Sequence, residues 1–380
     1  MNQPLTIDAL PQERVYFSSS VRDALGREID RTGASRVFVA TSKTLRQSTS
    51  AISLIASTLG SKCIEIHTGI EEHSKLDGII TAANIARNLK ADLLLGIGGG
   101  TIIDGLKIVQ LALAEDLTSL DQLLARKQPK LGSHHAIRQI AVPTTLSGAE
   151  VTPAGGGTDP QRGVKLGFAH PLLVPRSVIY DPAIGALTPE WLWLSSAIRG
   201  VDHCCEGVLA KNANDLFDAG LLQALRLFSA SLRRTKKVPG DPFARATSQT
   251  ASYLACSNSF RTGSGASHGI GYILGGRFGL HHGYTSCVML PHVLRWNSLV
   301  TAERQKLLSD AMDRPNMSAG DAVAELIADL ELPSRLRDLG LKNEDLEVIA
   351  EEAARHPVVR SNPRPITSSA DVMEILNAAW

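Results

Sequence analysis

The sequence lacks the features of a secreted or membrane-spanning protein. Its cysteines are few, odd in number and scattered, which argues against a disulfide framework and predicts a reducing compartment, the cytoplasm. No apolar run approaches the roughly 20 residues of a membrane span. The first residues show no basic segment followed by an apolar one, so we expect no signal peptide. The five cysteines are Cys63, Cys204, Cys205, Cys256 and Cys287.

Aromatic residues and net charge are also scarce. Aromatic side chains make up 4% of the chain, too few for the stacking platforms that bind single-stranded nucleic acid. The formal net charge is +1, so no excess of positive charge favours nucleic acid or an anionic membrane. We therefore expect a small-molecule ligand, and neither a nucleic-acid nor a membrane partner.

The first half of the chain alternates strand-like and helix-like segments, which predicts a parallel sheet covered by helices. A length of 380 residues, with 43% hydrophobic residues, predicts two folded domains rather than one. Strands are predicted at Arg36–Thr41, Cys63–His67, Asp92–Ile97, Gln139–Val142 and Ser177–Tyr180. Helices are predicted at Lys43–Leu59, Lys75–Leu89 and Thr101–Ala114.

After Tyr180 the pattern becomes helical, with few credible strands. A helix start is predicted with Thr188 at the N-cap and Pro189 at the first helical position. We therefore expect an α/β dinucleotide-binding domain over residues 1–184 and an all-helical catalytic domain over residues 185–380. Within the first domain, Gly155–Gly157 and the turn residues that follow predict an exposed hairpin or turn.

A buried strand runs directly into Gly98, Gly99 and Gly100, and Thr101 is positioned to cap the next helix. Glycines let the backbone approach a phosphate, and a helix N-terminus supplies unpaired N–H groups and a positive dipole end. This segment predicts a phosphate-binding turn, although it is neither a GxGxxG fingerprint nor a P-loop. Taken alone, it fits a tight strand-to-helix turn without a ligand equally well.

A second loop, Val142–Pro153, follows another predicted strand and is rich in hydroxyl groups. Thr144, Thr145 and Ser147 could donate hydrogen bonds to a pyrophosphate or a ribose. The alternative is a Ser/Thr-rich turn whose hydroxyl groups bond within the turn itself.

The helix that starts at Pro189 carries an apolar stripe at 3-4-3-4-3 spacing, and Arg199, His203 and Glu206 fall on its opposite face. A solvated face is the simpler interpretation of these three residues. Further along, His268 and Tyr272 lie one helical turn apart, and His282 follows fourteen residues after His268. Three histidines from two helices and a turn are a modest signal for acid–base or metal chemistry. The stripe consists of Trp191, Leu194, Ile198, Val201, Cys205 and Val208.

Several of these segments together resemble the iron-containing alcohol dehydrogenase family, and most closely its maleylacetate reductase branch. GGGTIIDGLK resembles the family's GGGSxxDxxK segment, with Thr101 in place of serine, and PTTLSGAEVTP resembles its PTTxxGSE segment. Gly163–Lys165 and PRSVIYDP at 175–182 continue the match. The motifs occur in family order from about residue 36 to 298. The resemblance implies an α/β dinucleotide-binding domain followed by an all-α domain, an architecture shared with dehydroquinate synthase-like proteins.

The resemblance also implies where a nicotinamide cofactor binds. Where many relatives have an aspartate that bonds the adenosine ribose, this chain has Ser42, so the choice between NAD and NADP stays open. Gly98, Gly99, Gly100, Thr101 and Asp104 would surround the pyrophosphate. Thr144, Thr145, Ser147 and Lys165 would lie along the nicotinamide half.

For the catalytic end, the resemblance implies a site without a catalytic metal. Metal-dependent relatives use an aspartate and three histidines, and this chain has Arg199 in the aspartate position, which cannot ligate a cation. If a metal binds at all, its ligands would be His203, His268 and His282. Tyr272 replaces the second histidine of the family's HxxxH pair, and Ser267, Gly269 and Gly271 also depart from the maleylacetate reductase pattern.

These observations predict an NAD(P)H-dependent reductase, similar to maleylacetate reductases, that acts on a small anionic oxo-acid or an enone-type substrate. Arg199 would stabilise developing negative charge, and His203, His268, Tyr272 and His282 complete the predicted catalytic set. Two alternatives stay open: a metal-dependent alcohol or aldehyde dehydrogenase, and a non-redox enzyme or binding protein that retains the fold. The resemblance further implies a homodimer and a role in aromatic compound catabolism. The NPRP segment at 362–365 suggests no chemistry.

Overall fold

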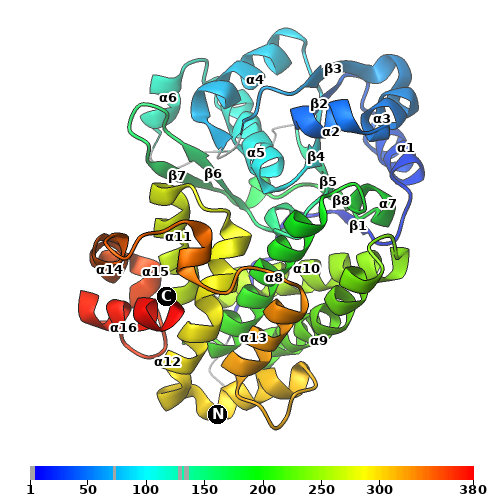
Figure 1. The fold of residues 1–380 in the computed structure, drawn as a ribbon. Helices are drawn as coiled ribbons and strands as arrows, with labels where there is room; N and C mark the ends of the chain where they lie inside the picture. The colour runs from blue at the N-terminus through cyan, green and yellow to red at the C-terminus, as the bar shows by residue number, and fades with distance from the viewer. Residues whose placement is uncertain (1–4, 72–73, 127–130, 132–136) are drawn as a thin grey trace. The chain divides into compact units, whose positions relative to one another are not determined.

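The computed structural model describes residues 5–71, 74–126, 131 and 137–380 (Figure 1). These residues form two compact units. The first contains the chain up to Thr144 together with Ala149–Asp181, and the second contains Thr145–Gly148 and Pro182–Trp380. The predicted domain boundary between residues 184 and 185 lies within the short helix α7 (Pro182–Gly185). Thr145–Gly148 belongs to the second unit, although the sequence pattern assigned it to the first domain.

The first unit contains a six-stranded sheet in which every neighbouring pair is parallel. The strand order is β1-β8-β5-β4-β2-β3. All residues of β2, β4 and β5 are buried, as expected for apolar strands covered on both faces. This sheet confirms the predicted α/β class, although the edge strand β1 was not predicted. The strands are β1 (Arg14–Tyr16), β2 (Val37–Thr41), β3 (Cys63–His67), β4 (Leu93–Gly98), β5 (Gln139–Pro143) and β8 (Ser177–Ile179).

Helices connect these strands, and the predicted helix over Lys43–Leu59 is wrong in one respect. The structure divides it into α2 (Lys43–Ser48) and α3 (Ala51–Leu59). The side chain of Thr49 bonds the carbonyl of Leu45 and the N–H of Ala51, and such local bonds compete with helix continuation. The other helices are α1 (Val21–Thr32), α4 (Leu76–Asn88), α5 (Gly100–Ala114) and α6 (Leu120–Leu124), with 3-10 turns at Gly60–Lys62, Ala149–Val151 and Pro171–Leu173.

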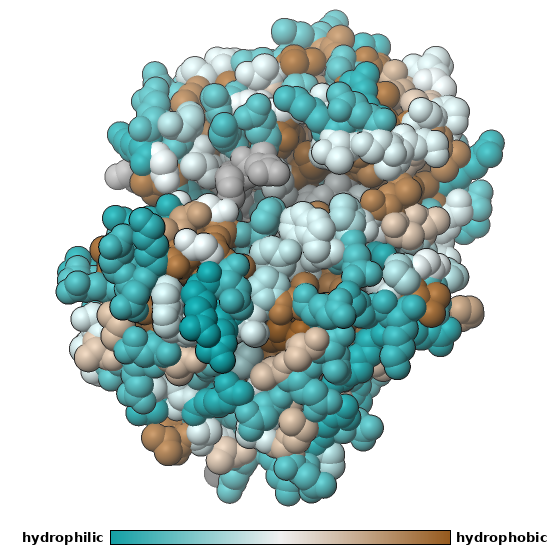
Figure 2. Space-filling model, in the orientation of Figure 1, coloured by the Kyte–Doolittle hydropathy of each residue, from teal (hydrophilic) through white to brown (hydrophobic). Residues whose placement is uncertain are grey.

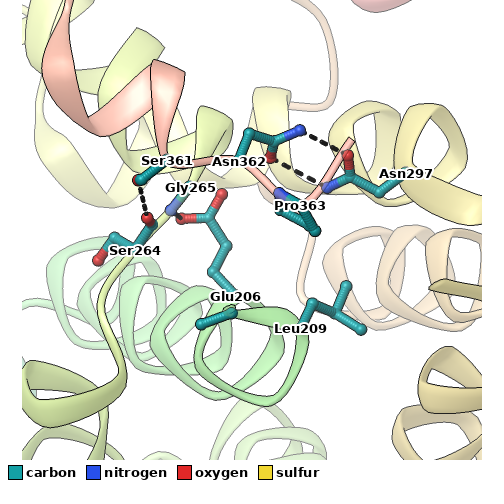
Figure 3. Close-up of a pocket in the computed structure, with 9 residues that line it drawn as sticks. Glu206, Leu209, Ser264, Gly265, Asn297, Ser361, Asn362 and Pro363 are labelled. Carbon is teal, nitrogen blue, oxygen red and sulfur yellow. Dashed lines mark hydrogen bonds between the residues drawn. The ribbon is translucent and has the colours of Figure 1, made fainter. Parts of the chain in front are cut away.

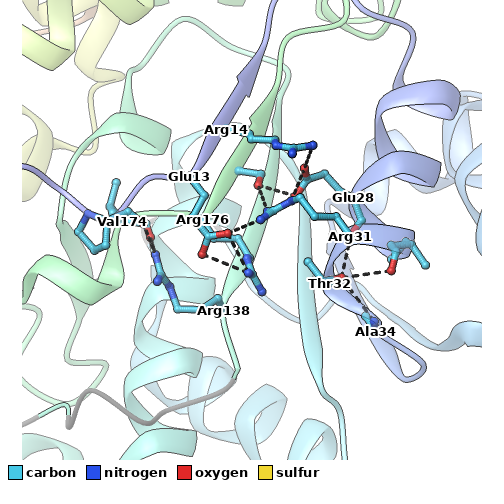
Figure 4. Close-up of polar contacts among 12 residues, drawn as sticks. Glu13, Arg14, Glu28, Arg31, Thr32, Ala34, Arg138, Val174 and Arg176 are labelled. Carbon is cyan, nitrogen blue, oxygen red and sulfur yellow. Dashed lines mark hydrogen bonds and ion pairs between the residues drawn. The ribbon is translucent and has the colours of Figure 1, made fainter.

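The edge strand β1 is held by side-chain contacts, among them the ion pair of Arg14 with Glu28 at 4.0 Å, as well as by its pairing with β8 (Figure 4). The Glu28 side chain on α1 is fully buried and accepts hydrogen bonds from Tyr16, Arg31 and Ser177. The Arg138 guanidinium donates to the carbonyls of Pro11 and Val174. A three-residue strand contributes little apolar burial, so these polar contacts are a large part of what fixes it.

The glycine-rich segment forms an antiparallel hairpin of β6 (Ala154–Thr158) and β7 (Lys165–Ala169). The hairpin prediction is confirmed, but Gly155 and Gly157 are buried rather than exposed. A Cβ on Gly157 would lie 2.3 Å from Leu76 Cδ2, and one on Gly155 would lie 3.0 Å from the Asp104 carbonyl oxygen. The glycines therefore let the hairpin pack directly against α4 and α5.

The described residues of the second unit form helices and no strand, as predicted. Helix α8 begins at Glu190 with Pro189 at its N-cap, one residue later than predicted. It packs against α9, α10 and α12. Among the residues that the structure describes, no helix could cross a membrane. Besides α7, the helices are α8 (Glu190–Leu209), α9 (Asp215–Lys237), α10 (Pro242–Thr262), α11 (Ala266–Phe278), α12 (His282–Ala311), α13 (Ala319–Asp329), α14 (Asp345–Arg355), α15 (Pro357–Arg360) and α16 (Ser369–Ala379), with a 3-10 turn at Leu336–Leu339.

The apolar stripe of α8 is mostly inside this unit. Ile198, Val201, Cys205 and Val208 are fully buried, whereas Trp191 near the start of the helix is 40% exposed. On the face shown in Figure 2, hydrophobic residues lie in small groups among hydrophilic ones. The helical periodicity of the sequence thus identified residues that are buried in the core.

Candidate active site

The predicted phosphate-binding turn joins β4 to α5 in the first unit. Gly99 is the N-cap of α5, so the first N–H groups of this 15-residue helix have no side-chain cap. The cap predicted at Thr101 is wrong, because the helix already begins at Gly100. The N–H of Thr144 donates to the Gly98 carbonyl at 3.0 Å, which joins this turn to the end of β5. An uncapped helix N-terminus beyond a buried parallel strand fits a pyrophosphate.

Asp104 and Lys107, on α5, link the helix to the segment that follows β5. The Lys107 side chain is fully buried, and its Nζ donates to the carbonyls of Ala149 and Ala154, both at 2.6 Å. It also lies 3.0 Å from Asp104 Oδ1, and Asp104 Oδ2 accepts from the Gly156 N–H at 3.4 Å. The structure therefore gives Asp104 protein partners. Lys107, absent from the predicted site residues, anchors the hairpin and the 3-10 turn against α5.

The hydroxyl-rich loop continues into the second unit. Thr145 Oγ1 contacts Ser147 Oγ at 3.4 Å, and the Leu146 N–H donates to Ser196 Oγ on α8. Gly148 has a φ of 72°, and a Cβ there would lie 2.0 Å from Cys256 Sγ on α10. A glycine is thus required at this position for both conformation and space.

Two further predicted cofactor residues lie in the first unit. Ser42 follows β2, whose last residue, Thr41, pairs with Ile97 of β4, so Ser42 lies at the same edge of the sheet as Gly98. Its hydroxyl caps α2 by accepting from the Leu45 N–H at 3.1 Å. Lys165 begins β7 and pairs with Thr158 of β6.

In the second unit, α8 and α11 bring two of the predicted histidines into contact. His203 Nδ1 lies 3.0 Å from His268 Nε2. His268 is fully buried, and its Nδ1 lies 2.8 Å from Glu206 Oε2 and 3.3 Å from Asp202 Oδ1. The solvated-face interpretation of α8 is wrong: Arg199 is 8% exposed and Glu206 is 5% exposed, because α11 and α12 pack close to this face.

Asp202 is the centre of this cluster, although it was not a predicted site residue. Its Oδ2 accepts hydrogen bonds from Ser267 Oγ at 2.8 Å and Ser286 Oγ at 2.6 Å. Arg199 Nη1 lies 3.8 Å from the same oxygen and donates to Ser286 Oγ at 3.3 Å. Asp202 therefore lies between the Arg199 guanidinium and the His268 imidazole. Its position three residues after Arg199 was the available signal for this pairing.

The two histidines have pKa values shifted in opposite directions. Burial lowers the pKa of His203, and the neighbouring His268 and Arg199 lower it further. Burial and Arg199 also act to lower the pKa of His268, but Asp202 and Glu206 outweigh them and raise it. Burial acts to raise the pKa of Asp202, yet His268 and Arg199 hold it below its ordinary value. His268, which faces the two carboxylates, therefore retains a proton more readily than His203 does.

Tyr272 and His282 complete the group. The Tyr272 ring is 6.5 Å from that of His268 and 6.2 Å from that of His282, between ring centres. The Arg199 guanidinium carbon lies 5.4 Å from the centre of the same ring. Tyr272 is 38% exposed, whereas His268 is fully buried. The structure thus gathers all five predicted catalytic residues in one part of the second unit.

Comparison with known proteins identifies the family. The model for the iron-containing alcohol dehydrogenase matches residues 11–182, and that for the C-terminal part of the Fe-containing alcohol dehydrogenase family matches residues 195–380. The chain belongs to the iron-containing alcohol dehydrogenase family. It is therefore an NAD(P)-dependent oxidoreductase, as its sequence motifs predicted.

Relatives within the iron-containing alcohol dehydrogenase family align over nearly the whole chain. Dehydrogenase ALT3 of Alternaria alternata is 31% identical over 91% of this chain and 99% of its own. Maleylacetate reductase 1 of Rhodococcus opacus is 29% identical over 97% of this chain and 94% of its own. The crystal structure of maleylacetate reductase from Agrobacterium tumefaciens, 27% identical, superposes with a TM-score of 0.85 and covers 100% of this chain and 99% of that one. The predicted resemblance to the maleylacetate reductase branch is confirmed.

The family's name raises the question of whether these residues fit an iron ion. Arg199 lies where the resemblance implies an aspartate ligand, and its positive charge acts to lower the pKa of both His203 and His268, although Asp202 and Glu206 raise that of His268 overall. The same repulsion acts on a divalent cation, which carries twice the charge. Asp202 and Glu206, the nearest carboxylates, already accept hydrogen bonds from serines and from the backbone of α11. Among the described residues, Asp202, Glu206 and His268 lie close enough together to hold an ion, but the Arg199 guanidinium beside Asp202 opposes one.

Proposed function

We propose that the chain is an NAD(P)H-dependent reductase, similar to maleylacetate reductases, that reduces a small oxo-acid or an enone-type substrate without a catalytic metal. The observation that carries the proposal is the buried Arg199 guanidinium beside the His203–His268 pair. A reductase must stabilise the oxyanion or enolate that forms on the substrate, and a fixed cation in a desolvated site does so. Arg199 can also bind a substrate carboxylate, which favours an anionic substrate.

The bound nicotinamide would supply a hydride to the carbonyl carbon, or to the carbon–carbon double bond conjugated with it. The protein must then supply one proton. His268 Nδ1 faces two carboxylates and therefore carries a hydrogen, so its Nε2 and His203 Nδ1 share one proton between them. A proton that moves from His268 to His203 Nδ1 lets His203 release another from Nε2 to the reduced substrate. Tyr272 is the second candidate donor.

The first test is a binding titration of metal-stripped protein with NADH and NADPH, followed by oxidation kinetics with maleylacetate and a panel of small oxo acids and aldehydes. Binding and turnover without added metal are expected. Turnover that appears only when a divalent metal is restored would favour the alternative, a metal-dependent alcohol or aldehyde dehydrogenase that uses His203, His268 and His282. If neither nucleotide binds, the chain is a non-redox protein that retains the fold.

Arg199→Met tests the proposed replacement for the metal. Loss of the cation should lower kcat/KM by about a hundredfold or more, as loss of a preorganised donor does. Arg245→Met is the matched control, because Arg245 is a buried arginine on α10 that contacts the Trp193 ring and lies outside the predicted site residues. An Arg199→Met protein with wild-type KM and kcat would refute the role of Arg199.

We further propose a cytoplasmic homodimer that acts in aromatic compound catabolism. All five cysteines are free thiols in the structure, in keeping with a reducing compartment. The edge position of β1 supports pairing of two copies through their N-terminal strands. Light scattering of the purified protein tests the dimer, and a monomeric mass would exclude it.

A further inference from the structure

The first turn of α11 carries His268, and its backbone N–H groups need acceptors from outside the helix. The N-cap is Gly265, which has no side chain. The orientation of His268 therefore depends on whatever accepts these N–H groups.

Glu206 on α8 accepts most of them. Its Oε2 accepts from the N–H of Gly265 at 2.7 Å and its Oε1 from the N–H of Ser267 at 2.7 Å. Oε2 also lies 3.4 Å from the N–H of His268 and 2.8 Å from His268 Nδ1. One carboxylate thus holds both the backbone and the ring of His268. The N–H of Ala266 is left without an acceptor from Glu206.

The N–H of Ala266 donates instead to Asn362 Oδ1, at 3.2 Å. Asn362 is fully buried, and its amide exchanges two hydrogen bonds with the amide of Asn297 on α12, at 3.1 and 2.7 Å (Figure 3). Its Nδ2 also donates to the Arg364 carbonyl at 2.7 Å. Both donors and both acceptor positions of the amide are therefore occupied, so the amide cannot turn without breaking bonds.

Residues close to Asn362 in the chain make further contacts that hold the segment around Asn362 in place. Ser361 Oγ donates to the Ser264 carbonyl at 2.8 Å. A Cβ on Gly269 would lie 2.8 Å from the Val359 nitrogen, so the backbones of α11 and α15 are in close contact. Arg364 stacks on Trp296, with its guanidinium carbon 3.3 Å from the ring centre. The NPRP segment, which suggested no chemistry in the sequence, thus completes the capping of α11.

We propose that Asn362 is a positioning residue for His268. Together with Glu206 it supplies acceptors for the N–H groups at the start of α11, and so fixes the distance from His268 Nε2 to His203 Nδ1. That this distance matters for reduction rests on the proposed function, whereas the placement of His268 by Asn362 does not.

Asn362→Ala tests the proposal, and Arg364→Met is its matched control on the same segment. The control removes the stack on Trp296 and the bond from Arg364 to the Trp296 carbonyl, but leaves the bond to Ala266 in place. The first readout needs no substrate: the nitrogen and proton chemical shifts of the His268 and His203 imidazoles. We expect the His268 shifts to change in Asn362→Ala and to match wild type in Arg364→Met.

The second readout is steady-state kinetics. For Asn362→Ala we expect kcat to fall by about tenfold or more while the KM for the nucleotide changes by less than about twofold, because a small displacement of a reacting group lowers the rate more than binding. Arg364→Met should keep the wild-type kcat. If wild type shows no turnover with any substrate, the proposed function fails, and the imidazole shifts still decide the positioning role.

A second variant covers the case in which Asn362→Ala does not fold. Ala266→Pro removes the donor of the same hydrogen bond at the first helical position, where proline is well tolerated. It should reproduce the shift change and the loss of kcat. Wild-type His268 shifts in a folded Asn362 or Ala266 variant, or an equal loss of kcat in Arg364→Met, would overturn the proposal.

Discussion

The two units present their predicted site residues in different ways. In the first unit, the turn after β4 offers backbone N–H groups and glycines, and its charged residues Asp104 and Lys107 bond to the protein itself. In the second unit, four buried side chains that can carry charge, Arg199, Asp202, Glu206 and His268, form the centre of the cluster. A site made of backbone N–H groups depends on the conformation of the main chain. The stability of a cluster of buried charges depends on every side chain in it being present. The two units should therefore respond differently to single substitutions.

The largest expected effect is that of Glu206→Ala in the second unit. It leaves three backbone N–H groups at the start of α11 without their acceptor and removes the nearer of the two carboxylates that face the His268 ring, so we expect the free energy of unfolding to fall by about 3 kcal/mol and activity to be lost. Chemical denaturation and NAD(P)H oxidation measure the two effects. Glu190→Ala, which removes a partly exposed ion pair with Lys236 near the start of the same helix, should change stability by less than about 1 kcal/mol. Equal effects of the two variants would contradict the special position of Glu206.

The corresponding change in the first unit is Lys107→Met. It leaves the carbonyls of Ala149 and Ala154 without a donor, and we expect a loss of about 2 kcal/mol in the free energy of unfolding. The bound nucleotide would contact the backbone of the turn, so its dissociation constant should change less than threefold or so. Calorimetric titration with NADH measures it. A large loss of nucleotide affinity in a folded protein would mean that side-chain charge matters in the first unit too.

Ser42→Asp tests the choice of nucleotide. An added carboxylate beyond β2 should repel the 2′-phosphate of NADPH and bond the ribose of NADH. We expect NADPH affinity to fall by about tenfold relative to NADH, measured as the ratio of the two dissociation constants. Ser57→Asp, an exposed serine on α3, is the control. An unchanged ratio would place the adenosine ribose away from Ser42.

The smallest expected effect is a change in how the free energy of unfolding depends on pH, caused by Glu28 beside β1. Burial acts to raise the pKa of Glu28, but hydrogen bonds from Arg31, Ser177 and Tyr16 hold it below its ordinary value of 4.5. Its stabilising contribution is therefore present above pH 4.5 and is lost as the pH falls through the lowered pKa. Between about pH 6 and pH 3 the free energy of unfolding should therefore fall less in Glu28→Gln than in wild type, as measured by urea denaturation. Glu71→Gln, in an exposed pair with Lys75, should keep nearly the wild-type dependence.

Strand alternation predicted the parallel sheet, because central strands such as β4 are continuous apolar runs. Helical spacing identified the apolar core residues of α8 but not the burial of its polar face. The edge strand β1 was missed, since three residues held by ionic contacts leave no periodic pattern. The break at Thr49 was also missed, because it depends on side-chain bonds to the local backbone.

For the candidate site, family motifs marked the glycine turn and the three histidines. The spacing of Asp202 from Arg199 could have indicated that pair, but the contact of Asp202 with Ser267 and that of Asn362 with Ala266 could not be predicted, since these partners are 65 and 96 residues away in the chain. Glu206 was noticed on the right face of α8, but a single helix cannot reveal that α11 covers that face. Contacts of this range become visible only when the fold is known.

The capping of α11 by Asn362 has a consequence for the order of events during synthesis. A ribosome makes the chain from its N-terminus, and the first unit can complete its sheet once β8 has emerged, because β8 lies between β1 and β5. The second unit must wait for residue 362 of 380 before the last N–H group at the start of α11 finds its acceptor. A growing chain could therefore contain the complete sheet of the first unit before Asn362 caps the start of α11. A chain that stops before residue 362 never forms this cap.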